Sequence, residues 1–264
     1  MKFLKPLGLL TLLAGCSQQP ALMEAPKSFS LIGGEYVSEA DLAGKSTIAI
    51  FSTHTNSKGE RFYNKCGAVI ASESAVITAA HCVDPTNFVS VESTLVFNRD
   101  LEDLRTEVHT RKSNTIIIHP AYNSAQNTSD IAVIQFTGGL PAGYSPATIS
   151  LDPIPLEPGD SVRILGYGIN DELSGKSDNR LRTAVVDVDG VSETSGVSLR
   201  QQPTYGSTCF GDSGSPSFFE YKDQLVAWGV ASTVRGRMGY KCNFRSFYMP
   251  FWMFKDFIKE NLSL

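Results

Sequence analysis

The sequence predicts an all-β fold that ends in one helix. From residue 31 onward, short apolar runs rich in valine, isoleucine, threonine and aromatic residues alternate with turns that contain glycine and proline. Many short strands punctuated in this way are typical of β-barrels and β-sandwiches. With 264 residues, of which 42% are hydrophobic, the chain is long enough to bury a sizeable core.

Nine segments carry the strand pattern, and a proline- and glycine-rich passage over 138–160 separates them into two groups. That passage is the predicted boundary between two halves of the fold. After the last strand, Phe251, Phe254, Ile258 and Leu262 recur at a spacing near 3.6, which predicts a packing helix. The predicted strands are 46–52, 66–71, 75–79, 115–118, 131–136, 161–165, 181–187, 217–219 and 225–230.

The first 15 residues have the features of an export signal. Lys2 and Lys5 precede a short apolar run over 7–14, which is too short to cross a bilayer as a permanent helix. The run meets Gly15-Cys16 and resembles a bacterial lipobox, in which cleavage exposes a cysteine that then carries a diacylglycerol. An ordinary signal peptide with a chance cysteine is the alternative. Residues 16–30 are polar and small, and we expect a tether or propeptide there.

The cysteine count agrees with lipidation of Cys16. Five cysteines in an exported protein leave one unpaired, whereas four remain if Cys16 is lipidated. We therefore expect an exported protein anchored to a bacterial membrane, either in the periplasm or on the cell surface. The remaining four are Cys66, Cys82, Cys209 and Cys242.

Charge and histidine content argue against two other classes of function. A formal net charge of -4 gives no support for a nucleic-acid partner, which usually needs a concentrated basic face. Four scattered histidines do not suggest a metal site. We expect neither a metal nor another cofactor.

Three short motifs carry the residue types needed for nucleophilic catalysis. Ser213 lies between glycines in the run Gly-Asp-Ser-Gly-Ser-Pro, His81 ends Thr-Ala-Ala-His before a cysteine, and Asp130 opens Asp-Ile-Ala-Val. A serine hydroxyl needs a base to attack a carbonyl, and histidine needs a third group to orient it. Taken singly, these residues fit a surface turn, a structural histidine and a strand-edge aspartate. Together they favour a catalytic triad.

The three motifs, in the order His, Asp, Ser, resemble those of the trypsin/chymotrypsin family of serine endopeptidases. The resemblance runs from about residue 31 to 262 and implies a catalytic domain over 31–264. It implies two antiparallel β-barrels with the catalytic cleft between them, and a C-terminal helix packed on the second barrel. It also implies hydrolysis of peptide bonds in a protein or peptide substrate through an acyl-enzyme intermediate.

The resemblance assigns further residues. It places the oxyanion hole at the amides of Gly211 and Ser213, and it pairs Cys66 with Cys82 and Cys209 with Cys242. It places Ser207 at the base of the specificity pocket, Trp228 and Gly229 along its edge, and Ser246 in its wall. Because Ser207 is not a carboxylate, we expect an apolar or aromatic residue before the scissile bond.

The run Leu31-Ile32-Gly33-Gly34 resembles the mature amino terminus of these enzymes. Cleavage after Ser30 would create an ammonium group at Leu31 that could pair with Asp212, and it would free the domain from Cys16. A serine before that bond departs from the usual basic residue, so a different activating protease is implied. We therefore expect a zymogen.

Three further departures from the family pattern stand near the site. Ala227 replaces a serine that usually supports the catalytic aspartate, Tyr167 replaces a tryptophan, and Ser215 replaces a glycine after the nucleophile. None removes an essential group. Two rival functions remain: a catalytically silent binding lipoprotein on the same fold, and an envelope adhesin or structural module.

Overall fold

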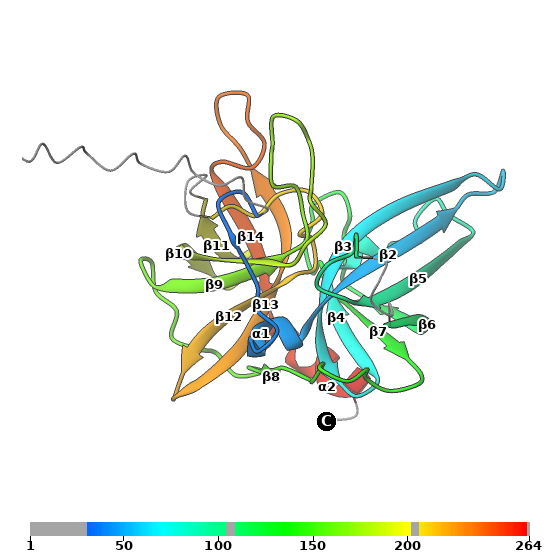
Figure 1. Cartoon of the computed structure of the whole chain (residues 1–264), viewed down its shortest axis with the longest axis horizontal. Helices are drawn as coiled ribbons and strands as arrows, with labels where there is room; N and C mark the ends of the chain where they lie inside the picture. The colour runs from blue at the N-terminus through cyan, green and yellow to red at the C-terminus, as the bar shows by residue number, and fades with distance from the viewer. Residues whose placement is uncertain (1–30, 104–108, 202–205, 263–264) are drawn as a thin grey trace, which may run out of the picture.

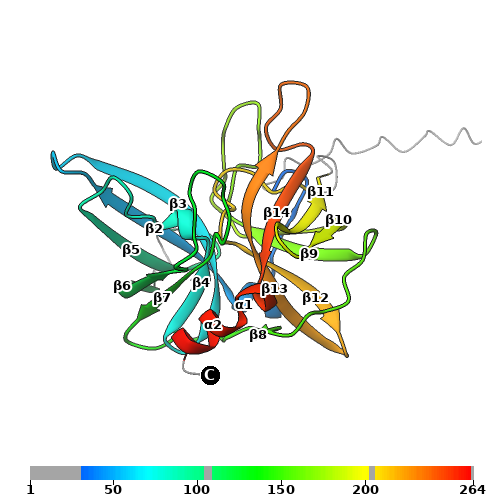
Figure 2. The same cartoon turned by 180° about the vertical axis from the view of Figure 1, so that it is seen from behind.

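The computed structural model of the chain describes residues 31–103, 109–201 and 206–262. It consists of two six-stranded antiparallel β-barrels that lie side by side (Figures 1 and 2). A short helix near the C-terminus lies at the base of the molecule, between the barrels. The all-β, two-barrel fold expected from the sequence is confirmed.

The first barrel closes in the order β2-β3-β4-β7-β6-β5. Its interior is apolar because alternate residues of each strand point inward, and isoleucines and valines fill those positions. The long β2 and β3 pair over their whole shared length, from Thr47 opposite Val69 to Thr55 opposite Arg61. The strands are β2 (Thr47–Thr55), β3 (Arg61–Ser72), β4 (Ala75–Thr78), β5 (Ser90–Phe97), β6 (His109–Ile118) and β7 (Ala132–Phe136).

The second barrel follows the order β10-β11-β14-β13-β12-β9 and closes by pairing of β9 with β10. Two short strands extend it: β1 pairs with β10, and β8 runs parallel to β13. The strands are β1 (Glu35–Tyr36), β8 (Thr148–Ile149), β9 (Ser161–Gly166), β10 (Arg182–Ser192), β11 (Gly196–Arg200), β12 (Pro216–Tyr221), β13 (Gln224–Arg235) and β14 (Arg245–Pro250).

All nine predicted segments overlap strands. The two-residue strands β1 and β8 were not predicted, and neither were the longer β5, β11 and β14. These three strands carry serine, glutamate or arginine on their solvent-facing positions, so their apolar runs are short. Their pairing to neighbouring strands, rather than their own composition, determines their conformation. The 138–160 passage joins β7 of the first barrel to β9 of the second.

Four short helical elements accompany the described strands, namely α1 (Leu42–Lys45), the 3-10 turns η1 (Ala80–Cys82) and η2 (Phe251–Phe254), and α2 (Lys255–Leu262). The expectation that the terminal helix packs on the second barrel is wrong in part. The turn η2 follows β14, but Asn261 of α2 accepts a hydrogen bond from Gln135 of β7, at 3.1 Å. His119 also packs against Phe254 and Phe257. The apolar face of this helix therefore joins the two barrels.

The predicted signal peptide, Cys16 and the tether up to Ser30 lie outside the described residues. Among the described helices, none is both long enough and apolar enough to cross a membrane.

Candidate active site

Ser213 lies on a tight loop whose shape depends on two glycines. Gly211 and Gly214 have φ angles of 94° and 75°, a region that side-chain-bearing residues rarely adopt. A Cβ on Gly214 would also lie 2.1 Å from the Thr78 hydroxyl oxygen and 2.4 Å from the Gly67 carbonyl oxygen. Both glycines are therefore required by the backbone path around Ser213.

The loop is held by both barrels. From the first barrel, the Gly67 amide donates to the Ser213 carbonyl at 2.7 Å, and in the second, the Gly214 amide donates to Ala231 at 2.7 Å. Gly67 has no side chain, and a Cβ there would lie 1.9 Å from the Ser215 hydroxyl oxygen. The serine at 215 therefore fits because its neighbour across the barrel interface is a glycine.

His81 and Asp130 form a directly bonded pair. His81 lies in η1, which the Cys66–Cys82 disulfide ties to β3. Its Nδ1 atom is 2.8 Å from Asp130 Oδ2, and its backbone amide donates to Asp130 Oδ1 at 2.9 Å. Two hydrogen bonds from one residue fix both the carboxylate and the plane of the imidazole ring.

Ser232 also supports Asp130, and the sequence analysis missed it. Its hydroxyl donates to Asp130 Oδ2 at 2.5 Å. The expectation that this support is lost at Ala227 is wrong, because Ala227 lies in the core of β13, five residues earlier. Burial alone would raise the pKa of Asp130, but the hydrogen bonds and charge of His81 and the Ser232 hydroxyl outweigh it, so the pKa lies below its usual value.

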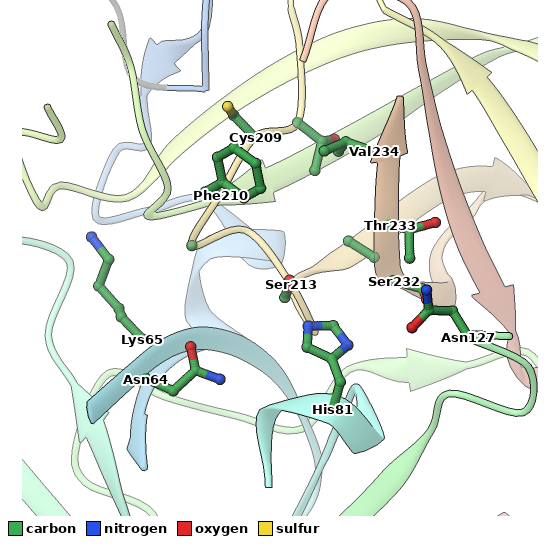
Figure 3. Close-up of a pocket in the computed structure, with 13 residues that line it drawn as sticks. Asn64, Lys65, His81, Asn127, Cys209, Phe210, Ser213, Ser232, Thr233 and Val234 are labelled. Carbon is green, nitrogen blue, oxygen red and sulfur yellow. The ribbon is translucent and has the colours of Figure 1, made fainter. Parts of the chain in front are cut away.

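Ser213 and His81 line one cavity of about 470 Å³. In Figure 3, the Ser213 side chain faces the His81 ring, with Asn64 and Lys65 on one side and Ser232, Thr233 and Val234 on the other. Within the described residues no hydrogen bond joins the Ser213 hydroxyl to the imidazole. Catalytic hydrogen bonds often tighten only when substrate is bound, so this geometry is compatible with proton transfer.

Two amides face the same cavity without a protein acceptor. Within the described part of the chain, neither Gly211 nor Ser213 donates its backbone N–H to another residue, although the Asp212 amide between them donates to Cys209 at 3.1 Å. A pair of unpaired amides beside a serine hydroxyl can bind the negative oxygen of a tetrahedral intermediate. The structure thus brings together the predicted oxyanion donors and the three triad side chains.

Comparison with known proteins agrees with this geometry. The family model described as "Trypsin" matches residues 44–258, which is most of the chain.

The chain belongs to the trypsin family.

Trypsin-family relatives match it at low identity. A brachyurin from Leptuca pugilator is 33% identical over 159 residues, covering 57% of this chain and 69% of that protein. A trypsin from Saccharopolyspora erythraea is 26% identical over 235 residues, covering 83% and 95%. The solved structure of human heparin binding protein shares the fold with a TM-score of 0.65 and 21% identity, covering 88% of this chain and 96% of that chain.

Trp228 and Gly229, expected along the edge of a specificity pocket, lie away from the cavity that contains Ser213. Trp228 is fully buried among the apolar residues of the second barrel and packs against Tyr248 and Trp252. Neither Trp228 nor Gly229 lines the cavity; Thr233 and Val234, further along β13, do. The part of β13 that borders the cavity therefore includes Ser232, the residue that donates to Asp130, and not the Trp228-Gly229 pair.

Ser207 and Ser246, predicted at the pocket base and wall, are fully buried and do not line the cavity. Their hydroxyls have no hydrogen-bond partner in the described regions. The adjacent Thr208 does line the cavity, and its hydroxyl is bonded to the Tyr248 hydroxyl at 3.0 Å. Of these neighbouring residues, Thr208 and not Ser207 is therefore accessible from the cavity.

Asp212 and Leu31, the residues expected to take part in activation, are both fully buried. Asp212 accepts hydrogen bonds from the amides of Gly168 at 2.7 Å and Cys209 at 2.9 Å, but no ion pair to it is present among the described residues. Burial raises its pKa to about 7. Ile32 bridges to Ser207, whose amide donates to the Ile32 carbonyl at 2.9 Å.

Both expected disulfides are present, Cys66–Cys82 and Cys209–Cys242. They also bear on metal binding, because the Cys66, His81 and Cys82 side chains lie within 4.8 Å of one another. The two sulfurs are bonded to each other and offer no thiolate to a metal ion. The Cys66–Cys82 disulfide therefore fixes the position of His81 and is not a set of metal ligands.

Proposed function

We propose that the chain is a serine endopeptidase that cleaves peptide bonds with Ser213, His81 and Asp130. The observation that carries this proposal is the convergence of three features on one cavity. These are the bonded His81–Asp130 pair, the Ser213 hydroxyl facing the imidazole, and two unpaired amides beside it. Membership of the trypsin family makes peptide substrates the natural expectation.

In the proposed reaction, His81 takes the Ser213 proton as the hydroxyl oxygen attacks the substrate carbonyl. The carbonyl oxygen becomes negative and accepts hydrogen bonds from the amides of Gly211 and Ser213. Asp130 offsets the imidazolium charge, and its buried position strengthens that interaction. The imidazolium then protonates the amine as the peptide C–N bond breaks, which leaves an acyl ester on Ser213. A water molecule that gives its proton to His81 attacks this ester, and the Ser213 oxygen leaves with that proton as the carboxylic acid product forms.

We propose a preference for an apolar residue before the scissile bond. No acidic side chain is among the cavity-lining residues, so a lysine or arginine side chain would have no carboxylate partner there. Val234 adds a branched apolar side chain at the cavity edge. Arg245, near the second disulfide, is already ion-paired with Asp189 at 2.5 Å, which argues against its use for acidic substrates. Profiling cleavage over a peptide library tests the preference.

We also retain the proposal that cleavage after Ser30 activates the enzyme and releases it from a lipid anchor at Cys16. Two observations support this proposal. Leu31 is buried, and Ile32 pairs with Ser207, which lies on the segment that leads to the loop around Ser213 (the nucleophile loop, 211–214). A new ammonium at Leu31 would offer Asp212 a direct counter-ion. Sequencing the amino terminus of active protein tests this. A form that begins at Cys16 and has full activity would contradict it.

A catalytically silent binding lipoprotein is the second candidate. It is favoured by one observation, namely that the fold also occurs in a protein named for binding, the human heparin binding protein. The bonded His81–Asp130 pair and the glycines that shape the Ser213 loop argue against it, because a binding role requires neither.

Labelling with a fluorophosphonate separates the two candidates. We expect covalent label on Ser213, and complete loss of label in Ser213→Ala. The matched control is Ser174→Ala, which removes an exposed hydroxyl on the loop after β9, bonded only to Asp171, and should label like the natural chain. A folded chain that takes up no label would favour the binding protein.

A further inference from the structure

Lys65 is a half-buried cation at the edge of the cavity, and the reaction steps above give it no role. It lies in β3 two residues before Gly67, so the two residues face the same side of the strand. Gly67 is bonded to the Ser213 carbonyl, and a Cβ on Gly211 would lie 3.2 Å from Lys65 Cε. The lysine stem therefore lies directly against the nucleophile loop.

The ammonium group of Lys65 is fully engaged by the second barrel. Its Nζ donates to the Tyr167 carbonyl at 2.8 Å, to Asn179 Oδ1 at 2.7 Å and to the Ser177 hydroxyl at 3.4 Å. An ammonium has three protons to donate, and these three acceptors account for them. All three acceptors belong to the segment between β9 and β10. The lysine thus crosses from the first barrel to the second instead of pointing freely into solvent.

One of these contacts reaches Asp212 through a single peptide group. The Tyr167 carbonyl that accepts from Lys65 and the Gly168 amide that donates to Asp212 Oδ1 at 2.7 Å are the two ends of the same peptide bond. A cation on the carbonyl oxygen polarises the peptide and strengthens its N–H as a donor. The ammonium, the peptide and the carboxylate form one polarised chain.

Asp212 needs such support because it is fully buried and has no direct ion pair in the described ranges. Burial raises its pKa to about 7, and the amides of Cys209 and Gly168 and the charge of Lys65 act in the opposite direction. Burial lowers the pKa of Lys65 in turn, and Asp212, Asp178 and Glu102 oppose that effect. The half-buried ammonium and the buried carboxylate therefore stabilise each other's charged forms.

We propose that Lys65 is a positioning residue: through the Tyr167–Gly168 peptide it holds Asp212, and with it the Gly211 and Ser213 amides, in the conformation that binds an oxyanion. The inference rests on the proposed endopeptidase function. Lys65 supplies a counter-charge to Asp212 that does not depend on cleavage after Ser30. The uncut chain therefore has a partly ordered oxyanion hole.

The test compares Lys65→Met, which keeps the length of the side chain and removes its charge, with Lys65→Arg. Loss of a whole oxyanion donor costs about 10²–10³ in rate, so loss of a residue that positions two donors should lower kcat by roughly 10-fold to 100-fold. KM for a peptide substrate should change little, because Lys65 does not contact the scissile group. Lys65→Arg should recover part of the lost rate, since it keeps the cation. An effect confined to KM would instead make Lys65 a substrate-binding residue and overturn the proposal.

A double-mutant cycle tests whether the effect passes through Asp212. In an Asp212→Asn background, Lys65→Met should lower kcat much less than in the natural chain, because no carboxylate is left to hold. Equal effects in both backgrounds would contradict the inference. Lys112→Met is the matched control, since this exposed lysine of β6 donates only to Thr94 and should leave kcat unchanged.

Amide hydrogen exchange over residues 206–215 separates this inference from the proposed function. Faster exchange in Lys65→Met than in the natural chain and in Lys112→Met supports the positioning role, whether or not the protein hydrolyses peptides. Unchanged exchange overturns it. Failure of the endopeptidase proposal would appear separately, as absence of fluorophosphonate label on Ser213 in the natural chain.

Discussion

Two buried aspartates belong to the candidate active site around Ser213, and their surroundings differ. Both Asp130 and Asp212 are fully buried. Asp130 receives direct hydrogen bonds from His81 and Ser232, and its pKa lies below the usual value. Among the residues that the structure describes, Asp212 accepts hydrogen bonds only from backbone amides, with Lys65 one peptide away, and burial raises its pKa to about 7. Direct charged and hydroxyl donors can keep a buried carboxylate ionised, whereas neutral amides alone only partly offset the cost of burial.

The difference matches two separate tasks. In the proposed reaction, Asp130 must stay charged in order to orient His81 and stabilise the imidazolium. Asp212 is proposed to hold the loop that carries Gly211 and Ser213. Its charge would depend on a nearby cation, either Lys65 or the ammonium that cleavage would create at Leu31. We infer that Asp130 stays ionised throughout the proposed reaction, whereas the charge of Asp212 depends on a nearby cation.

If the two aspartates differ in this way, removing the charge of Asp130 by Asp130→Asn should have the largest effect on kcat. The amide cannot balance the imidazolium charge and favours the wrong tautomer, so kcat should fall by about 10⁴, as it does for the equivalent change in a well-studied serine protease. Steady-state kinetics on a peptide substrate measure it. Asp84→Asn, in the loop just after η1, is the matched control because Asp84 only accepts from the Thr86 amide. A loss below 10-fold at position 130 would contradict the assigned role.

A smaller effect is expected for Ser232→Ala. It removes one of the donors to Asp130 and leaves the His81 contacts in place, so kcat should fall by roughly 10-fold and the free energy of unfolding by about 1–3 kcal/mol. Kinetics and urea denaturation measure the two quantities. Ser217→Ala, which removes a buried hydroxyl bonded to the Arg163 carbonyl, controls for loss of a buried hydroxyl elsewhere in the barrel. Equal kinetics for both variants would argue that Ser232 does not support Asp130.

The smallest effect concerns the pH dependence of stability. The folded-state pKa of Asp212 is raised, so between about pH 4 and 7 the folded chain holds a proton that the unfolded chain has lost. This residue therefore makes the free energy of unfolding decrease as pH rises through that window. Asp130 acts in the opposite direction at lower pH: its folded-state pKa is depressed, so its contribution is lost as pH falls through that pKa.

Denaturation at a series of pH values checks this, with Asp212→Asn as the variant. The decrease between pH 4 and 7 should become shallower in Asp212→Asn, while Asp160→Asn, on the exposed loop before β9, should leave it unchanged. A wild-type profile that matches Asp212→Asn across this window would show that Asp212 remains ionised in the folded chain throughout.

The sequence allowed a triad to be proposed because Ser213, His81 and Asp130 each sit in a short motif with its own chemical signature, and the structure places these three residues close together. The support around the triad was harder to predict. Ser232 lies in β13 of the second barrel and reaches Asp130 only because the two barrels pack against each other. The Trp228-Gly229 pair, which resembled a pocket edge, lies in a part of the same strand that is buried away from the cavity. Lys65 gives no signal in the sequence, because its partners lie 102 to 114 residues away. Short motifs reveal reacting groups, whereas positioning groups depend on long-range pairing.

The most direct test of the account is the crystal structure of the chain after reaction with a fluorophosphonate. We predict phosphorus bonded to the Ser213 hydroxyl oxygen, with a phosphoryl oxygen 2.7–3.1 Å from the amide nitrogens of Gly211 and Ser213. An unreacted Ser213 under conditions that fully modify a reference serine protease, or an adduct whose phosphoryl oxygen points away from both amides, would contradict it.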